Sequence, residues 1–233
     1  MSEELERRAA LFAALGEPIR LALVDRLIAG DLSPGELARS LGLGTNLLAH
    51  HLRVLEEAGV IRRTRSEGDR RRSYIQLRRD DPTIRAVART VTAPAGLPAT
   101  VDRVVFVCTA NSARSQFAAA SWNSVSPIPA ASAGTHPAPH VHPRAARVAR
   151  RHGMDLGSAV PADIENVLRG DELIVAVCDN AHEELTQGLQ RLHWSVPDPA
   201  SSDTDEAFED AYVALNQRVH DLSALQAGMR KAS

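Results

Sequence analysis

A cysteine and an arginine six residues apart have the types and spacing that suit a nucleophilic reaction in this 233-residue sequence. Cys108 can supply a thiolate, the reactive form of cysteine, and Arg114 can clamp two oxygens of a tetrahedral oxyanion. Ser115 follows with a hydroxyl that can donate to the sulfur. The residues of the candidate anion-binding loop are Thr109, Ala110, Asn111, Ser112 and Ala113. Because the chain is rich in arginine, this spacing is a weak signal until the neighbouring elements are considered.

The segments on either side of the loop strengthen the prediction of an anion site. Residues 103–107 form a short apolar run with β-branched side chains, which predicts a strand buried on both faces. A helical stretch, residues 116–123, follows the loop. A strand, a loop and a helix in this order direct backbone N–H groups and the positive end of the helix at an anion. The same field stabilises a thiolate at Cys108.

A carboxylate suited to proton transfer lies ninety residues after Cys108, in a loop stiffened by proline. Asp198 stands between Pro197 and Pro199. We expect it to act as the general acid, because a thiolate that attacks phosphorus or arsenic needs a proton delivered to the departing oxygen. The alternative is a structural role in which Asp198 forms an Asx-type turn before the proline.

Residues 104–222 resemble the low-molecular-weight protein tyrosine phosphatase superfamily and, within it, the arsenate reductases that share its fold. The motifs that carry the resemblance are VFVCTANSARSQ, SAGTHP, HPRAARVARRHGMDL, LIVAVCDNAHEE and HWSVPDPA. The resemblance implies an α/β domain with a four-stranded parallel sheet and helices on both faces. It also implies that Cys108 is the nucleophile, Arg114 the oxyanion clamp and Asp198 the acid. Asn111 and Ser115 would then organise the loop and the thiolate.

Two departures from the phosphatase pattern favour an arsenate reductase. Phosphatases of this group typically carry an aromatic residue directly after the Asp-Pro of the acid loop, and this chain has Ala200 there. Many also have a second cysteine inside the anion loop, where this chain has Ala113. A protein tyrosine phosphatase fused to a regulator remains the alternative activity. A third reading is a purely regulatory protein whose loop senses an anion or a redox state.

The other cysteine of the chain, Cys178, leaves two reductive routes open. Thioredoxin-coupled reductases relay oxidation through two further cysteines, but residues 179–188 contain none, so a three-thiol relay cannot form. Cys178 could instead form a disulfide directly with Cys108. Alternatively, an external thiol, either a small molecule or a thiol-redox protein, could resolve the adduct while Cys178 packs as a small buried hydrophobe. In either case we expect no bound cofactor.

Three histidines lie in the proline-rich segment THPAPHVHP, at His136, His140 and His142. Their spacing matches no established zinc pattern. We therefore predict no metal site.

The first third of the chain is predicted to be mostly helical. Two amphipathic segments, residues 5–15 and 18–30, precede a third helix that a capping box of Ser33 and Glu36 begins. A glycine turn then leads to a fourth helix, residues 45–58. A helix, a glycine turn and a second helix are typical of a helix-turn-helix DNA reader.

An arginine-rich hairpin is predicted directly after these helices. Residues 60–65 and 71–77 have strand character and flank a turn at 66–69. Eight arginines lie between positions 62 and 79, a density that suits the phosphate backbone of DNA, although a solvated charged face is the alternative. The residues expected to contact DNA are Thr45, Asn46, His50, Arg53, Arg70, Arg71 and Arg72.

Residues 12–77 resemble the winged-helix repressors of the ArsR family, through FAALGEPIRLALVDRL, LSPGELARSLGL, HHLRVLEEAGVI and RRTRSEGDRRRSYIQL. The resemblance implies a homodimer, built on helices at residues 5–15 and 82–91, that binds a double-stranded DNA operator. Family members that sense thiophilic metals carry a cysteine cluster before the recognition helix, and residues 31–41 contain no cysteine. Adjacent His50 and His51 project about 100° apart on a helix, which favours DNA contact or plain surface over zinc binding.

Charge divides the chain into two parts. Residues 1–90 hold 16 arginines and 13 acidic residues, and the remainder holds 11 basic and 16 acidic residues. The uncharged segment 92–100 predicts a linker between a winged-helix domain, residues 1–91, and an α/β domain, residues 101–233. With no long apolar run and a charged N-terminus, we expect a cytoplasmic protein with no membrane partner. The combined prediction is a bifunctional transcriptional regulator and thiol-dependent arsenate reductase.

Overall fold

The computed structural model describes residues 2–90, 97–98, 100–185 and 189–232, with side chains up to residue 230. The chain folds into two compact units, Met1–Ser66 with Arg70–Leu97, and Glu67–Asp69 with Pro98–Ser233. Most of the predicted linker, residues 92–100, lies outside the described residues. Across the described ranges, no helix combines the length and the apolar character needed to cross a membrane.

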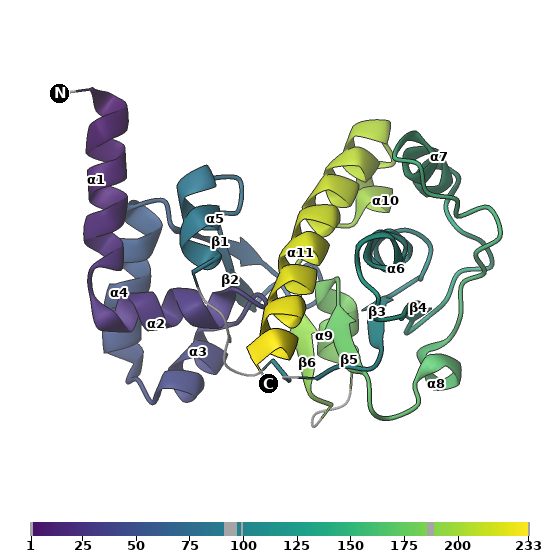
Figure 1. Cartoon of the computed structure of the whole chain (residues 1–233), viewed down its shortest axis with the longest axis horizontal. Helices are drawn as coiled ribbons and strands as arrows, with labels where there is room; N and C mark the ends of the chain where they lie inside the picture. Colours follow the sequence, from purple (N-terminus) through teal and green to yellow (C-terminus); the bar gives the residue numbers. More distant parts are fainter. Residues whose placement is uncertain (1, 91–96, 99, 186–188, 233) are drawn as a thin grey trace. The chain divides into compact units, whose positions relative to one another are not determined.

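The first unit is mainly helical (Figure 1). Its helices are α1 (Glu3–Leu15), α2 (Pro18–Leu27), α3 (Pro34–Leu41), α4 (Thr45–Glu57) and α5 (Pro82–Ala88). Leucines on one stripe of each amphipathic helix form the core, and Leu11, Leu27 and Leu52 are all buried. The helix predicted at residues 18–30 is shorter than expected, because α2 ends at Leu27.

Helices α3 and α4 form the predicted helix-turn-helix. The capping box is confirmed, since Ser33 accepts from the backbone N–H of Glu36 while Glu36 accepts from the backbone N–H of Ser33. Gly42 ends α3 in the left-handed region, with φ of 64°, which glycine adopts without steric cost. Gly59, with φ of 71°, follows α4 as predicted.

The hairpin after α4 consists of β1 (Ile61–Arg65) and β2 (Ser73–Leu77), paired antiparallel with Ile61 opposite Leu77. Strand β2 begins two residues later than predicted. The burial pattern gives the reason, because Tyr74, Ile75 and Leu77 are buried whereas residues 71 and 72 are exposed. The arginines at 70–72 therefore lie outside the paired ladder.

The second unit is an α/β fold (Figure 1). In chain order its elements are β3 (Val104–Cys108), α6 (Arg114–Val125), β4 (Ala130–Gly134), α7 (Pro143–Arg151), α8 (Ile164–Val167), β5 (Leu173–Ala176), α9 (Asp179–Glu184), β6 (Arg191–His193), α10 (Pro199–Ser202) and α11 (Asp205–Ala232). The predicted four-stranded parallel sheet is confirmed, with the strand order β4-β3-β5-β6.

The parallel register decides which residues meet at the carboxyl edge of this sheet. Cys108 at the end of β3 pairs with Gly134 of β4, and Val107 pairs with Ala176 of β5. Cys178 follows Ala176 by two residues, so both cysteines emerge at the same edge. Ligand sites of open α/β sheets lie at this edge.

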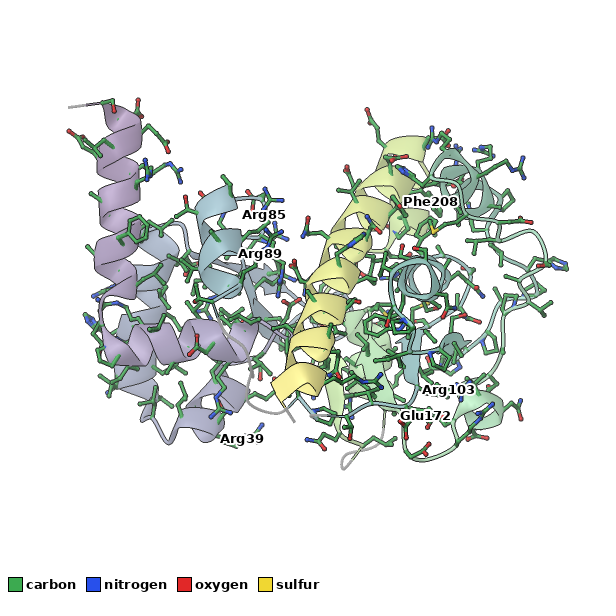
Figure 2. The ribbon with its side chains drawn as sticks, viewed as in Figure 1. Arg39, Arg85, Arg89, Arg103, Glu172 and Phe208 are labelled. Carbon is green, nitrogen blue, oxygen red and sulfur yellow. The ribbon has the colours of Figure 1, made fainter. Side chains whose placement is uncertain are left out.

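At the amino ends of the strands, an ion pair joins the residues that precede β3 and β5. Arg103, which precedes β3, donates to the carboxylate of Glu172, which precedes β5, at 2.7 Å (Figure 2). The predicted strand at residues 103–107 thus begins one residue later, with Arg103 anchoring its amino end.

Candidate active site and nucleic-acid interface

The anion loop runs from the end of β3 to the start of α6. Cys108 is buried, with 2% of its surface exposed. Helix α6 begins at Arg114, two residues before the predicted start, so Arg114 and Ser115 form its first turn. Of the other predicted loop residues, Asn111 and Ala113 are buried, while Thr109, Ala110 and Ser112 are partly exposed.

A hydrogen-bond chain leads from Asn111 to the sulfur of Cys108. Asn111 Nδ2 donates to Ser115 Oγ at 2.8 Å, and Ser115 Oγ lies 3.0 Å from Cys108 Sγ. Because the Ser115 oxygen already accepts from Asn111, its own hydrogen is available for the sulfur. A hydroxyl that donates to sulfur stabilises the thiolate form.

Asn111 is held in a conformation that few residues adopt. Its φ is 49°, in the left-handed region where asparagine is enriched. The side-chain oxygen accepts from the backbone N–H of Ala162 at 2.9 Å, and Gln116 Nε2 donates to the Asn111 carbonyl at 3.1 Å. The sequence prediction did not include Gln116, whose burial and contact with the loop are evident only in the structure.

The histidine-rich segment holds the outer side of the loop. Backbone N–H groups of Thr135, His136, Ala138 and His142 donate to loop carbonyls at 2.8–3.1 Å. The accepting carbonyls belong to Cys108, Thr109, Ala110 and Ser112. A loop whose carbonyls are bound in this way can direct its amide N–H groups at an anion.

Gly134 lets this segment approach the loop closely. A Cβ atom at this position would lie 2.7 Å from the Thr109 carbonyl oxygen and 3.0 Å from Asn111 Cβ. A side chain would therefore displace the backbone of the anion loop.

Arg114 links the anion loop to the acid loop. It is buried, with 5% exposed. Nη1 donates to the carbonyl of Val196 at 2.9 Å, and Nη2 lies 3.2 Å from Asp198 Oδ1. Burial alone lowers the pKa of Arg114, but its electrostatic interactions with Cys178, Cys108 and Asp198 raise the pKa above its usual range. The guanidinium therefore stays charged.

Asp198 takes the predicted turn role, and it also lies beside Arg114. It caps α10, because its Oδ1 accepts from the backbone N–H of Ala200 at 3.3 Å. The same oxygen faces Arg114. The turn role and contact with Arg114 are thus compatible. The residue after Asp198 and Pro199 is the exposed Ala200.

Cys178 lies at the start of α9, next to the anion loop. It caps α9, with Sγ accepting from the backbone N–H of Ala181 at 3.4 Å, and it lies 3.6 Å from Thr109 Oγ1 in the anion loop. Burial, only partly offset by Arg114, raises the pKa of Cys178 to about 11. At neutral pH this thiol is protonated.

The three histidines of the proline-rich segment have separate surroundings. His136 lies 3.3 Å from Glu184, His142 faces Asp203, and His140 is exposed. In the described part of the chain, no group of three or more His, Cys, Asp or Glu residues could hold a metal ion.

The first unit presents the expected DNA-contacting residues at its surface. Thr45, Asn46, His50 and Arg53 of α4 are exposed, as are Arg70, Arg71 and Arg72. Leu47 is exposed to 46% on the same helix, a position that the sequence prediction did not single out. The expectation of DNA contact or surface for His51 is wrong, because this ring is buried, with Nδ1 3.4 Å from the carboxylate of Glu17 at the start of α2.

Comparisons with known proteins cover both units. Residues 103–231 match the family described as low molecular weight phosphotyrosine protein phosphatase. Residues 15–64 match a helix-turn-helix domain.

Three individual proteins illustrate these matches. Arsenate reductase 2 of Staphylococcus saprophyticus is 30% identical over 128 residues, which cover 50% of this chain and 92% of the relative. The biofilm growth-associated repressor of Xylella fastidiosa is 38% identical over 68 residues, 28% of this chain and 60% of the repressor. The tyrosine phosphatase Wzb of Escherichia coli K30, solved with sulphate, is 21% identical with a TM-score of 0.49, covering 53% of this chain and 97% of Wzb. The chain thus spans about 60% of the length of the repressor that it matches.

Proposed function

The chain belongs to the low molecular weight phosphotyrosine protein phosphatase family and carries an ArsR-type helix-turn-helix domain before it, and we propose that it is a DNA-binding regulator that also reduces arsenate with an external thiol. The observation that carries the enzymatic part is the convergence of Cys108, Arg114 and Asp198 on one anion loop. A thiol nucleophile, a fixed cation and a proton donor are what displacement at a tetrahedral oxyanion needs.

In the first step, the Cys108 thiolate attacks arsenic in an arsenate held by Arg114 and the loop amides. Asp198 donates a proton to the departing oxygen, which leaves as water while a sulfur–arsenic bond forms. The hydroxyl of Ser115 stabilises the thiolate before attack. No metal ion takes part in this scheme.

In the second step, an external thiol attacks the Cys108 sulfur. A disulfide forms between that thiol and Cys108, and the electron pair of the sulfur–arsenic bond reduces arsenic(V) to arsenic(III), which leaves as arsenite. A second external thiol then releases Cys108. We assign this step to an external thiol because burial raises the pKa of Cys178 to about 11, which disfavours its thiolate at neutral pH, and the thiolate is the nucleophile.

The acid loop favours arsenate over a phosphotyrosine side chain. The residue after Asp198 and Pro199 is Ala200, which is exposed and offers no ring surface on which an aryl group could stack. Aromatic stacking is worth about 0.5–1.5 kcal/mol, so its absence lowers the affinity for an aryl phosphate by up to about tenfold. Arsenate has no ring and loses nothing.

The enzymatic proposal predicts arsenite formation that depends on thiol. Full-length protein is incubated with arsenate with and without glutathione, and separately with p-nitrophenyl phosphate. We expect arsenite only when the thiol is present. Efficient turnover of the aryl phosphate without arsenite would establish a phosphatase, and no turnover of either compound would leave a regulator that senses an anion.

The first unit is proposed to bind a double-stranded operator as a homodimer. The exposed polar side chains of α4 would reach base edges, and residues 70–72 would contact phosphates. A helix-turn-helix domain with an exposed arginine cluster beside it supports this assignment.

Removing the exposed arginines at residues 70–72, between β1 and β2, is expected to weaken DNA binding in a salt-dependent way. Each phosphate contact contributes a slope of about −0.9 in a plot of log affinity against log salt. The triple change of Arg70, Arg71 and Arg72 to Ala should therefore reduce the slope by up to about 3 and lower affinity up to about 100-fold at 0.1 M salt. Fluorescence anisotropy with selected operator DNA measures both quantities.

The matched control removes three exposed arginines from α7 in the second unit, Arg147, Arg150 and Arg151. It changes the net charge by the same amount. Equal slopes for the two triple variants would show that residues 70–72 do not contact phosphates.

A further inference from the structure

A single residue beyond the acid loop adopts a backbone conformation that needs explanation. Asp203 ends α10 with φ of 48° and ψ of 44°. Among the described residues, Asn111 and Asp203 are the non-glycine residues with positive φ. Such conformations persist where the surroundings hold them, and they gather at functional sites. Asn111 helps to shape the anion loop, and Asp203 has the same kind of backbone conformation just beyond the acid loop.

The surroundings of Asp203 are two side chains at the start of α7. Arg144 Nε lies 2.8 Å from Asp203 Oδ1, and His142 Nε2 lies 3.6 Å from the same oxygen. Arg144 also pairs with Asp205, so it keeps a carboxylate partner when Asp203 is changed. The side chain of Asp203 is therefore tied to α7 by charge.

His142 connects this cluster to the anion loop. Its backbone N–H donates to the carbonyl of Ser112 at 2.9 Å. Its ring stacks on Phe208, with centroids 4.5 Å apart. Phe208 lies in the first turn of α11 (Figure 2). His142 thus cannot move without disturbing either the anion loop or the start of α11.

The short helix α10 transmits this position to Asp198. Asp198 caps one end of α10 and Asp203 caps the other, with the Asp203 N–H donating to the Pro199 carbonyl at 3.1 Å. Pro199 further restricts the backbone at the first helical position. Because α10 has four residues and both of its ends are capped, we expect it to move as a rigid unit. A constraint on the position of Asp203 therefore also constrains the position of Asp198.

We propose that Asp203 is a positioning residue that, through Arg144 and His142, holds the Asp198 loop in register with the anion loop. The inference rests on the proposed role of Asp198 as general acid. Proton transfer demands hydrogen-bond distance to the departing oxygen, and loosening of the supporting residues lowers its efficiency.

The test uses two changes that preserve the backbone of Asp203. Asn and Gly both tolerate the left-handed region, so Asp203→Asn and Asp203→Gly remove the carboxylate without adding strain. We expect kcat for thiol-dependent arsenate reduction to fall about tenfold with KM for arsenate unchanged, and the alkaline limb of the pH profile to flatten. The amides of Ala200 and Ser201 should exchange hydrogen at least about fivefold faster, and this readout does not require activity.

The matched control is Glu209→Gln. Glu209 of α11 also pairs with an arginine and a histidine at the end of α7, namely Arg151 at 3.0 Å and His152. Its loss removes a comparable charged link, between α11 and the end of α7, without touching α10. We expect kcat, the pH profile and the Ala200 exchange rate to stay at their wild-type values.

Asp198→Asn separates failure of this inference from failure of the proposed acid. If Asp198→Asn leaves the alkaline limb intact, the acid role is wrong. If Asp198→Asn removes the limb while both Asp203 variants keep wild-type kcat and amide exchange, the positioning role is wrong. Should either Asp203 variant fail to fold, Arg144→Gln removes the partner from α7 and is read by the same two measurements.

Discussion

Replacement of Cys108 by Ser is expected to lower arsenate reduction by roughly 1,000-fold or more, the usual scale for loss of a catalytic nucleophile. Serine has nearly the same size and can keep the contact with Ser115 Oγ, now 3.0 Å from the sulfur. Its hydroxyl is not ionised at neutral pH, however, and an oxygen–arsenic bond cannot pass its electron pair to arsenic when a thiol attacks. Arsenite formed per minute from arsenate and glutathione measures the loss.

Cys178→Ser is the matched control, since it removes the other buried thiol of the same edge. We expect it to keep most of the wild-type turnover, because the proposed second step uses an external thiol. A Cys108–Cys178 disulfide found by mass spectrometry after one turnover without added thiol would show that Cys178, and not an external thiol, attacks the Cys108 sulfur. Full activity of Cys108→Ser would refute the nucleophile itself.

The local parts of the site could be predicted from the sequence because their signals lie within a few residues. The apolar run before Cys108 predicted the buried strand β3, and the small residues after it predicted the loop. Ser33 and Glu36 predicted their capping box for the same reason, since both partners lie in one turn. Asp198 could be placed on a rigid loop because proline flanks it on both sides.

The contacts that join distant segments could not be predicted in this way. Nothing near Asn111 indicates that the Ala162 N–H approaches its side chain, since 51 residues separate them. The orientation of α4 likewise depends on the helices packed against it, which is why His51 is buried while its neighbour His50 is exposed. Periodicity indicates that one face is buried, but the exact boundary of that face is decided by tertiary packing.

The environment of Cys178 bears on two interpretations that the sequence leaves open. The sequence allowed both a resolving thiol and a packed hydrophobe. In the structure the thiol lies near Thr109 and Arg114, yet burial dominates and raises its pKa to about 11. Proximity alone therefore does not make this thiol a nucleophile, and the assignment depends on the balance of desolvation against charge.

Replacement of Arg114 by Lys is expected to lower kcat/KM for arsenate by roughly 100- to 1,000-fold, although the positive charge is kept. The range is that for loss of one fixed oxyanion donor. Arg114 uses a planar fork, with Nη1 on the Val196 carbonyl and Nη2 facing Asp198. An ammonium is a point charge on a flexible chain and cannot hold two acceptors while it binds an oxyanion. Steady-state kinetics of arsenite formation, with thermal unfolding to verify the fold, measures the effect.

The expected loss separates geometry from charge at this position. If charge alone stabilised the anion, Arg114→Lys would keep kcat/KM within a few-fold of the wild-type value. Arg147→Lys, made at an exposed arginine of α7, provides the matched control for the chemical change and should leave kcat/KM unaltered. Arg114 contacts the Val196 carbonyl and Asp198 at the same time. A large loss of kcat/KM at Arg114 with none at Arg147 would therefore mean that the acid loop and the anion loop act together only when one rigid group binds both.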